Sequence, residues 1–144
     1  MMRGRGFAAI GLFNPKTDHN VGGVMRAAFC YSASLIVIQG HRYRRQASDT
    51  TDARRHIPTL HVADLLGALP HDCVPVAVEI DPSARSLFRY RHPERAFYIF
   101  GPEDGSLPRH LTERCRDLIS IPTAACMNLA ATANVVLYDR MAKQ

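Results

Sequence analysis

Several features that would assign the chain to a broad class are missing from its sequence. No apolar run approaches the roughly 20 residues that a membrane-spanning helix needs. The apolar stretch near the N-terminus breaks at Asn14-Pro15 without a small-residue cleavage site, so we expect no signal peptide. No two of the four cysteines have CxxC spacing, which favours a reducing cytoplasm and a protein without a metal site or disulfide framework. The motifs GxGxxG and GxxxxGK(S/T) are also absent, so no dinucleotide-binding or phosphate-binding loop of these kinds is expected.

Lysine is scarce, whereas arginine is abundant. Of the 18 basic residues only Lys16 and Lys143 are lysine, and the formal net charge is +5. The planar guanidinium suits contacts to phosphates and bases, so this composition favours a nucleic-acid partner, although an arginine-rich genome would produce the same bias. With 144 residues, 47% of them hydrophobic, the chain has the size and core of one domain, which we place at residues 1–144.

Short apolar runs alternate with helical stretches along the chain. This order predicts an α/β fold, a single domain with a mostly parallel sheet and helices on both faces. Pro75 favours an early or edge position for its strand. In such sheets ligands bind beyond the carboxyl ends of the strands. The predicted strands are Phe7–Phe13, Leu35–Gln39, Val74–Ile80, Ala96–Phe100 and Leu118–Ile121, and the predicted helices are Asn20–Tyr31, Ala63–Leu69, Pro108–Cys115 and Met127–Ala142.

The first predicted helix opens with the segment Asn20-Val-Gly-Gly-Val-Met-Arg26. Asn20 is a residue type that caps helix N-termini, and the two glycines would let a ligand approach the backbone closely. Arg26 lies about one and two-thirds turns further along the helix. Taken alone, the segment fits a capped helix with a solvated arginine better than a functional site.

Two further segments directly follow predicted strands. Phe100-Gly-Pro-Glu-Asp-Gly-Ser-Leu-Pro108 combines a tight turn with two carboxylates, and Ile121-Pro-Thr-Ala-Ala-Cys-Met-Asn-Leu129 leads into the last helix. Each has a structural explanation of its own, as an acidic turn before a helix or as a helix cap provided by Asn128. The presence of all three segments in this order is a more specific signal of function than any one segment alone.

In this order the three segments resemble the motifs of the SpoU–TrmH branch of the SPOUT class of RNA methyltransferases. The resemblance runs from the first strand to the final helix. The first motif, Asn-x-Gly-x-x-x-Arg, is matched by Asn20, Gly22 and Arg26, the second, Phe-Gly-x-Glu, by Phe100, Gly101 and Glu103, and the third by Ile121, Pro122, Asn128, Leu129, Tyr138 and Asp139.

The sequence departs from this pattern in three places. Gly105-Ser106 stands where Arg-Gly usually precedes Leu-Pro, and Ala124-Ala125 stands where polar residues are frequent. Cys126 occupies a place where serine or another small residue is common. The cofactor that the resemblance implies is S-adenosylmethionine. We expect its methionine end to be held differently from the usual pattern because of these departures.

The resemblance implies the cofactor S-adenosylmethionine, no metal, an RNA substrate, an obligate homodimer with the first and last helices at its interface, and a deep trefoil knot near the C-terminus. It also implies methyl transfer to a ribose 2′-hydroxyl, with Arg26 stabilising the developing oxyanion. The catalytic residues that it implies are Arg26, Asn20, Glu103 and Asn128, and the cofactor-binding residues are Val78, Gly101, Ile121, Cys126 and Leu129.

The polar stretch Gly40–His56 supplies basic groups for RNA. We predict that Arg42, Arg44 and Arg45 bind phosphates while Tyr43 stacks on a base, although a solvated loop would have the same composition. Because no separate RNA-binding domain is expected, tRNA is favoured over rRNA. The alternative is a non-catalytic RNA-binding dimer that retains the fold, and the presence of Asn20, Arg26 and Asn128 argues against it.

Overall fold

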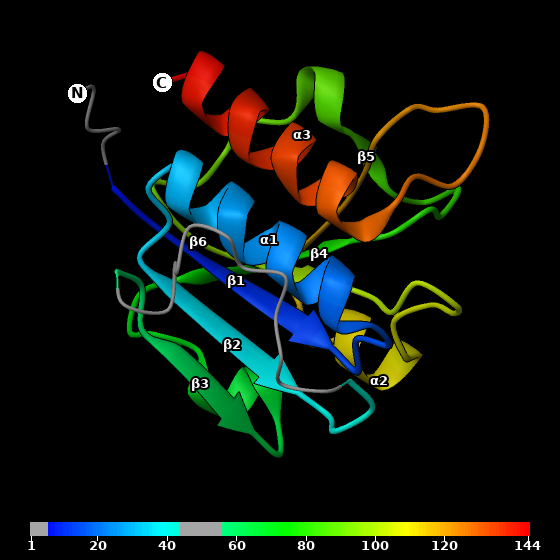
Figure 1. The fold of residues 1–144 in the computed structure, drawn as a ribbon. Coiled ribbons are helices and arrows are strands. Elements are labelled where there is room, and N and C mark those ends of the chain that lie inside the picture. The colour runs from blue at the N-terminus through cyan, green and yellow to red at the C-terminus, as the bar shows by residue number, and fades with distance from the viewer. Residues whose placement is uncertain (1–5, 44–55) are drawn as a thin grey trace.

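A computed structural model of the protein describes residues 6–43 and 56–144. Within these residues, seven strands form one sheet in the order β3-β2-β1-β6-β4-β7-β5, and every neighbouring pair is parallel (Figure 1). The predicted α/β fold is therefore confirmed. The strands are β1 Phe7–Phe13, β2 Leu35–Gln39, β3 Thr59–Val62, β4 Val74–Val78, β5 Arg85–Ser86, β6 Arg95–Phe100 and β7 Asp117–Ser120, the α-helices are α1 Asp18–Cys30, α2 Arg109–Thr112 and α3 Leu129–Ala142, and the 3₁₀ helices are η2 Leu65–Ala68 and η3 Leu87–Arg89.

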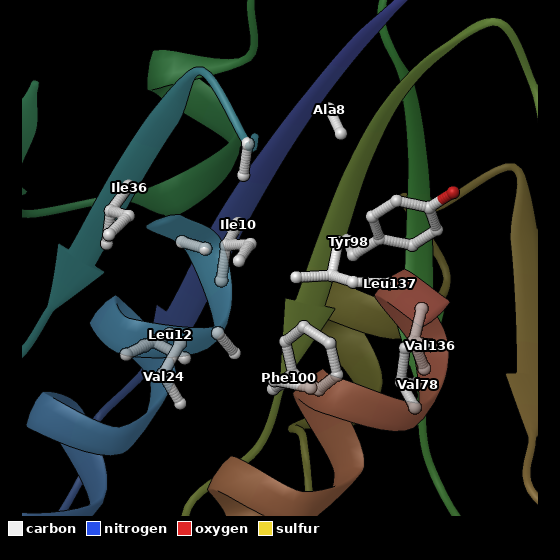
Figure 2. Close-up of a cluster of buried hydrophobic side chains, with 14 of the residues drawn as sticks. Ala8, Ile10, Leu12, Val24, Ile36, Val78, Tyr98, Phe100, Val136 and Leu137 are labelled. Carbon is white, nitrogen blue, oxygen red and sulfur yellow. The ribbon is translucent and has the colours of Figure 1, made fainter. Parts of the chain in front are cut away.

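Successive side chains of a strand point to opposite faces of the sheet. Both faces are buried here, because each carries its own hydrophobic cluster. On one face, Ile10 and Tyr98 pack with the apolar sides of α1 and α3, which lie side by side (Figures 1 and 2). On the other face, Ala9 and Phe97 pack with residues of η2 and α2, among them Leu111. Helices thus cover both faces, although those on the second face are short.

The two long helices approach each other closely at Gly23. A Cβ atom added to Gly23 would lie 2.7 Å from the Cβ of Ala130 in α3. Such a separation is shorter than van der Waals contact, so a larger residue would push the helices apart. The first-motif glycines were predicted to admit a ligand, but the neighbour at Gly23 is the last helix of the same chain.

Some elements differ from the prediction. Strands β1 and β2 have the predicted bounds, whereas the short edge strands β3 and β5 were not predicted. Pro75 is the second residue of β4, as an early position requires, but β4 lies between β6 and β7, so an edge position is wrong. The predicted helices Ala63–Leu69 and Pro108–Cys115 contain only η2 and the single turn of α2. The trefoil knot and the assignment of residues 1–144 to one domain stay predictions.

A buried arginine fixes the C-terminal end of α3. Arg140 is only 5% exposed. Its guanidinium donates hydrogen bonds of 2.6 Å to the carbonyls of Pro93 and Glu94, and one of 3.1 Å to the hydroxyl of Tyr98. The end of α3 is therefore held to the segment that leads into β6.

A histidine extends this buried network. His92 Nδ1 lies 2.7 Å from the Tyr98 hydroxyl, and His92 Nε2 lies 2.6 Å from the carboxylate of Asp139. Burial lowers the pKa of His92, and the nearby charge of Asp139 opposes the shift without cancelling it. Burial also raises the pKa of Tyr98 to about 12. A neutral imidazole satisfies the network, because Nε2–H donates to Asp139 while Nδ1 accepts from Tyr98.

Candidate active site

A pocket opens at the carboxyl ends of β4, β6 and β7, which is where parallel sheets bind ligands. Apolar side chains form much of its wall, and Glu79 and Glu103 add two carboxylates. All five residues predicted to bind the cofactor line this pocket: Val78, Gly101, Ile121, Cys126 and Leu129. The structure therefore brings together residues from the second and third motifs and from the end of β4.

Glu79 is a pocket residue to which the sequence assigned no role, although its place near the carboxyl end of a predicted strand put it where a ligand was expected. Its Oε2 accepts a hydrogen bond of 2.7 Å from the backbone N–H of Leu107, which fixes the end of the loop after β6. A Cβ atom at Gly101 would lie 3.3 Å from the Leu107 nitrogen and 3.4 Å from Glu79 Oε2, so the loop passes too close for a larger residue without a shift.

The loop after β6 is also tied to the loops after β1 and β2. Glu103 Oε2 accepts a hydrogen bond of 2.8 Å from the backbone N–H of Lys16. Arg42 donates two hydrogen bonds of 2.9 Å to the Asp104 carboxylate and one of 2.8 Å to the carbonyl of Asn14. The hydrogen bonds from Arg42 lower the pKa of Asp104 to about 2. Three loops are therefore held together beside the pocket.

These contacts bear on the predicted RNA-binding residues. The Arg42 guanidinium is engaged by groups of the protein, so a phosphate would compete with Asp104 for it. Arg44 and Arg45 lie outside the described residues. Tyr43 is only 7% exposed and its hydroxyl lies 2.5 Å from His61 Nε2, so the prediction that Tyr43 stacks on a base is wrong.

Asn20 and Asn128, which belong to different motifs, meet beside the starts of α1 and α3. Asn128 Nδ2 donates a hydrogen bond of 2.7 Å to Asn20 Oδ1, while Asn128 Oδ1 caps α3 by accepting from Ala131 at 3.1 Å. Asn20 itself is not a cap. Helix α1 begins earlier than predicted, at Asp18, and its cap is Thr17, whose hydroxyl accepts from the Asn20 N–H at 3.2 Å.

The predicted catalytic residues occupy three neighbouring places rather than one. Glu103 lines the pocket, and the Asn20–Asn128 pair joins two helix starts. Arg26 is exposed on α1 and is not among the residues that line the pocket. It lies about 9 Å along the helix from Asn20 at 1.5 Å per residue.

The pocket combines apolar walls with carboxylates and the hydroxyls of Thr123 and Thr132. This lining suits an organic ligand that has an apolar ring, hydrogen-bond donors and a positive charge. Within residues 6–43 and 56–144, no three His, Cys, Asp or Glu side chains are grouped so that they could hold a metal ion. In the same part of the chain, no helix is long and apolar enough to cross a membrane.

Solved structures share this fold. AviRb, a SpoU methyltransferase from Streptomyces viridochromogenes solved with AdoMet, superposes with a TM-score of 0.85 at 18% identity over 99% of this chain and 59% of its own length. A structure concerned with 2-OH methylation of C/U34 on tRNA gives 0.80 at 23% identity, with 98% of this chain and 92% of that one covered. The TrmH/SpoU tRNA modifying enzyme of A. aeolicus gives 0.82 at 14% identity, covering 94% and 74%.

Sequence comparison extends this likeness of fold to a family. No curated protein sequence matches the chain significantly. A sequence profile of the SpoU rRNA Methylase family matches residues 8–138, a range that contains all three motif segments and every residue of the pocket. The chain therefore belongs to the SpoU rRNA methylase family, whose members are RNA methyltransferases.

Proposed function

We propose that this protein is an S-adenosylmethionine-dependent RNA ribose 2′-O-methyltransferase that acts on tRNA in the cytoplasm as a homodimer. The observation that carries the proposal is the convergence of the three motif segments. Two of them line one pocket, and the Asn20–Asn128 hydrogen bond joins the first segment to the third. If the capped helix and the acidic turn served only the fold, these three segments would not need to lie next to one another.

The pocket fits S-adenosylmethionine. Val78, Ile121 and Leu129 offer apolar contacts for the adenine ring, and Gly101 lines the same pocket without a side chain. Glu79 and Glu103 add negative charge for the positively charged end. When bound, this cofactor supplies an electrophilic methyl group on a sulfonium.

Arg26 gives the chain a group that assists attack by a ribose hydroxyl. The 2′-hydroxyl is a weak nucleophile, so negative charge must be stabilised on its oxygen as the bond to the methyl carbon forms. Because a guanidinium stays protonated in proteins, Arg26 stabilises this charge rather than accepting the proton. The proton leaves to water or to an RNA phosphate, and the sulfur keeps the electron pair of the broken bond.

The homodimer is supported by apolar side chains that α1 and α3 leave exposed. Tyr138 is 57% exposed, and Phe29, Val135 and Met141 are also exposed although large and apolar. Such residues on two adjacent helices are typical of an interface. Light scattering should give a particle of twice 16.0 kDa at micromolar concentration, and a particle of 16.0 kDa would contradict the dimer.

The preference for tRNA is supported by the structure concerned with tRNA 2-OH methylation, of which this chain covers 92%. AviRb is much longer than this chain, which spans 59% of its length. The likeness to that structure over nearly its whole length is our reason for favouring tRNA.

The experiment is methyl transfer from labelled S-adenosylmethionine to tRNA and, separately, to rRNA from a strain that lacks the gene. Mass spectrometry of the digested nucleosides should find the label on the ribose of a tRNA nucleotide. Label on a base would refute the 2′-O assignment, and label only in rRNA would refute the substrate. RNA binding without any transfer would leave the non-catalytic RNA-binding dimer as the explanation.

A further inference from the structure

A basic segment at the sheet edge carries an unusually exposed aromatic ring. Residues 85–91 read Arg-Ser-Leu-Phe-Arg-Tyr-Arg, with three arginines and no acidic residue. They form β5 and η3 and the two residues that follow. Phe88 is 75% exposed, more than any other large hydrophobic side chain in the described part of the chain. Neither the predicted site nor the pocket includes this segment.

The local fold fixes Phe88 in its outward position. In a 3₁₀ helix residues three apart lie on the same side, so the buried side chains of Leu87 and Tyr90 face inward together and Phe88 faces solvent. Lys143 Nζ holds the turn by donating to the carbonyls of Leu87 and Tyr90 at 2.6 and 3.0 Å, and the Tyr90 hydroxyl donates to Asp117 at 2.7 Å. Ordering this ring on a ligand would therefore cost little entropy.

The arginines of this segment are available for an anion. The side chains of Arg85, Arg89 and Arg91 are exposed, and within residues 6–43 and 56–144 none of them makes a hydrogen bond or an ion pair. Other exposed arginines do have carboxylate partners: Arg109 contacts Glu113 at 2.8 Å, Arg114 contacts Asp64 at 3.6 Å, and Arg42 contacts Asp104 at 2.9 Å. Three exposed arginines without a hydrogen bond or ion pair in the described part of the chain, all within three residues of an exposed ring, favour an anionic partner that has planar groups.

The segment lies next to a loop of the pocket. In the register of β5 and β7, Arg85 pairs with Ile119 and Ser86 with Ser120. Ile121, which lines the pocket, is the next residue along the chain. Strand β5 therefore lies beside the end of β7, where the loop to α3 begins. A long ligand could therefore reach the segment and the pocket at the same time.

We propose that this edge surface, formed by Arg85, Phe88, Arg89 and Arg91, binds the RNA substrate beside the target nucleotide. An unpaired base stacks on Phe88, and the neighbouring phosphates contact the three arginines. Stacking on an aromatic ring combined with contacts to backbone phosphates is how proteins hold single-stranded RNA. The inference rests on the proposed function, because it assumes an RNA substrate for this family member.

The sequence contains no tryptophan, which allows a direct test. The Phe88→Trp protein carries a single tryptophan, whose fluorescence should be quenched by a single-stranded oligoribonucleotide of mixed sequence and by bulk tRNA. A blunt RNA duplex, whose bases are paired, should quench it much less. The matched control is Leu60→Trp, because Leu60 is also exposed but lies on β3 at the opposite edge of the sheet. Equal quenching in both variants, or in neither, would overturn the inference.

Affinity measurements test the same surface without a reporter. Phe88→Ala should weaken binding of the oligonucleotide about tenfold. Replacing Arg85, Arg89 and Arg91 together by Gln should reduce the steepness of the salt dependence. The slope of log affinity against log salt concentration should become shallower by about 2, since each phosphate contact to a single strand contributes about 0.7 to it. The double variant Arg109→Gln, Arg114→Gln serves as the charge control. Unchanged affinity and slope in folded edge variants would refute the proposal, as would a change of oligomeric mass, which would assign the surface to a protein interface.

Failure of the inference and failure of the proposed function can be distinguished. Edge variants that bind RNA like wild type, in a protein that transfers methyl groups, would overturn only the inference. Quenching at Phe88→Trp by RNA, in a protein that neither binds S-adenosylmethionine nor transfers its methyl group, would overturn only the proposed function. Affinity for S-adenosylmethionine should stay at the wild-type value in every edge variant.

Discussion

The two ends of helix α3 are held by polar contacts of opposite kinds. At its start, Asn128 and Asn20 form an exposed hydrogen bond beside the pocket. At its end, Arg140 and His92 belong to a buried network with Tyr98 and the segment before β6. The helix therefore has one end anchored in the core and the other presented to solvent and ligands.

This difference separates contributions to stability from contributions to function. A buried polar group that loses its partner costs the full penalty of desolvation, whereas an exposed one is solvated again by water. Changes at the end of α3 should therefore lower stability and leave the chemistry of folded molecules intact. Changes at the start of α3 and in the pocket loops should lower the rate of methyl transfer and have little effect on stability.

The largest effect on the exposed side is expected from Arg26→Ala. Losing one donor to a developing oxyanion lowers turnover by about 10²–10³. The melting temperature should stay close to that of wild type, because Arg26 is exposed on α1. Single-turnover methyl transfer measures the rate, and Arg26→Lys should restore little because an ammonium lacks the planar fork. Wild-type turnover in folded Arg26→Ala would remove the residue from the mechanism.

The largest effect on the buried side is expected from Arg140→Met. The change removes three hydrogen bonds of a buried guanidinium, leaves the Pro93 carbonyl without its donor, and should lower the free energy of unfolding by about 3 kcal/mol. Urea denaturation checks the value, with Arg109→Met on the exposed surface of α2 as the control. Turnover per folded molecule should be retained. Lost turnover with unchanged stability would contradict the separation of the two ends.

The exposed asparagine pair should have a smaller effect on stability. Asn128→Ala removes the cap of α3 and should cost about 1 kcal/mol. Asn20→Ala removes only the exposed hydrogen bond and should cost about 0.5 kcal/mol. In single-turnover methyl transfer, the double variant should lose less than the product of the two single losses, because both disrupt one contact. Independent losses would mean that the bond has no role in the site.

The buried histidine predicts a pH dependence at the other end of α3. Its pKa is lowered in the folded state, so the unfolded chain takes up a proton first as the pH falls. The stability that His92 contributes is thus present above about pH 6.5, its unfolded pKa, and is lost as the pH falls toward the lower folded value. Thermal melts of His92→Gln, which keeps a donor for Asp139, should show a flatter dependence below pH 6.5 than wild type. Parallel curves would contradict the assignment of a neutral imidazole.

The smallest effect is expected from Arg42→Gln. The ion pair with Asp104 is exposed and therefore weak and screened by salt. If it positions the loop after β6, the KM for S-adenosylmethionine should rise about two- to threefold at low salt, and Asp104→Asn should reproduce the change. RNA affinity should hardly change. Weaker RNA binding with an unchanged KM would instead support the phosphate contact that the sequence predicted for Arg42.

The sequence predicted the central strands and the pocket better than the edges. β1 and β2 have long apolar runs and were predicted to the residue. Of the five cofactor residues, Val78 ends β4 and the other four lie in the segments that follow β6 and β7. β3 was missed because two of its four residues are exposed, and β5 because it has only two residues. These strands depend on pairing with a neighbour rather than on a pattern of their own.

Contacts between distant loops could not be predicted from local patterns. The bond between Asn20 and Asn128 joins positions 108 residues apart, and Arg42 meets Asp104 across 62 residues. The second contact follows from the order of the strands, which places the ends of β1, β2 and β6 beside one another, and the first follows from the packing of α1 against α3. The cap of α1 was misplaced for a local reason, since Thr17 and Asn20 are both suitable cap residues.

The central claim is that the pocket after β4, β6 and β7 holds S-adenosylmethionine for methyl transfer. Calorimetric titration of the purified protein with S-adenosylmethionine in the presence of a chelator tests this claim most directly. We expect saturable binding of one cofactor per chain, since the described residues offer it a pocket without metal ligands. No heat, together with no thermal shift by the cofactor or its demethylated product, would contradict the account.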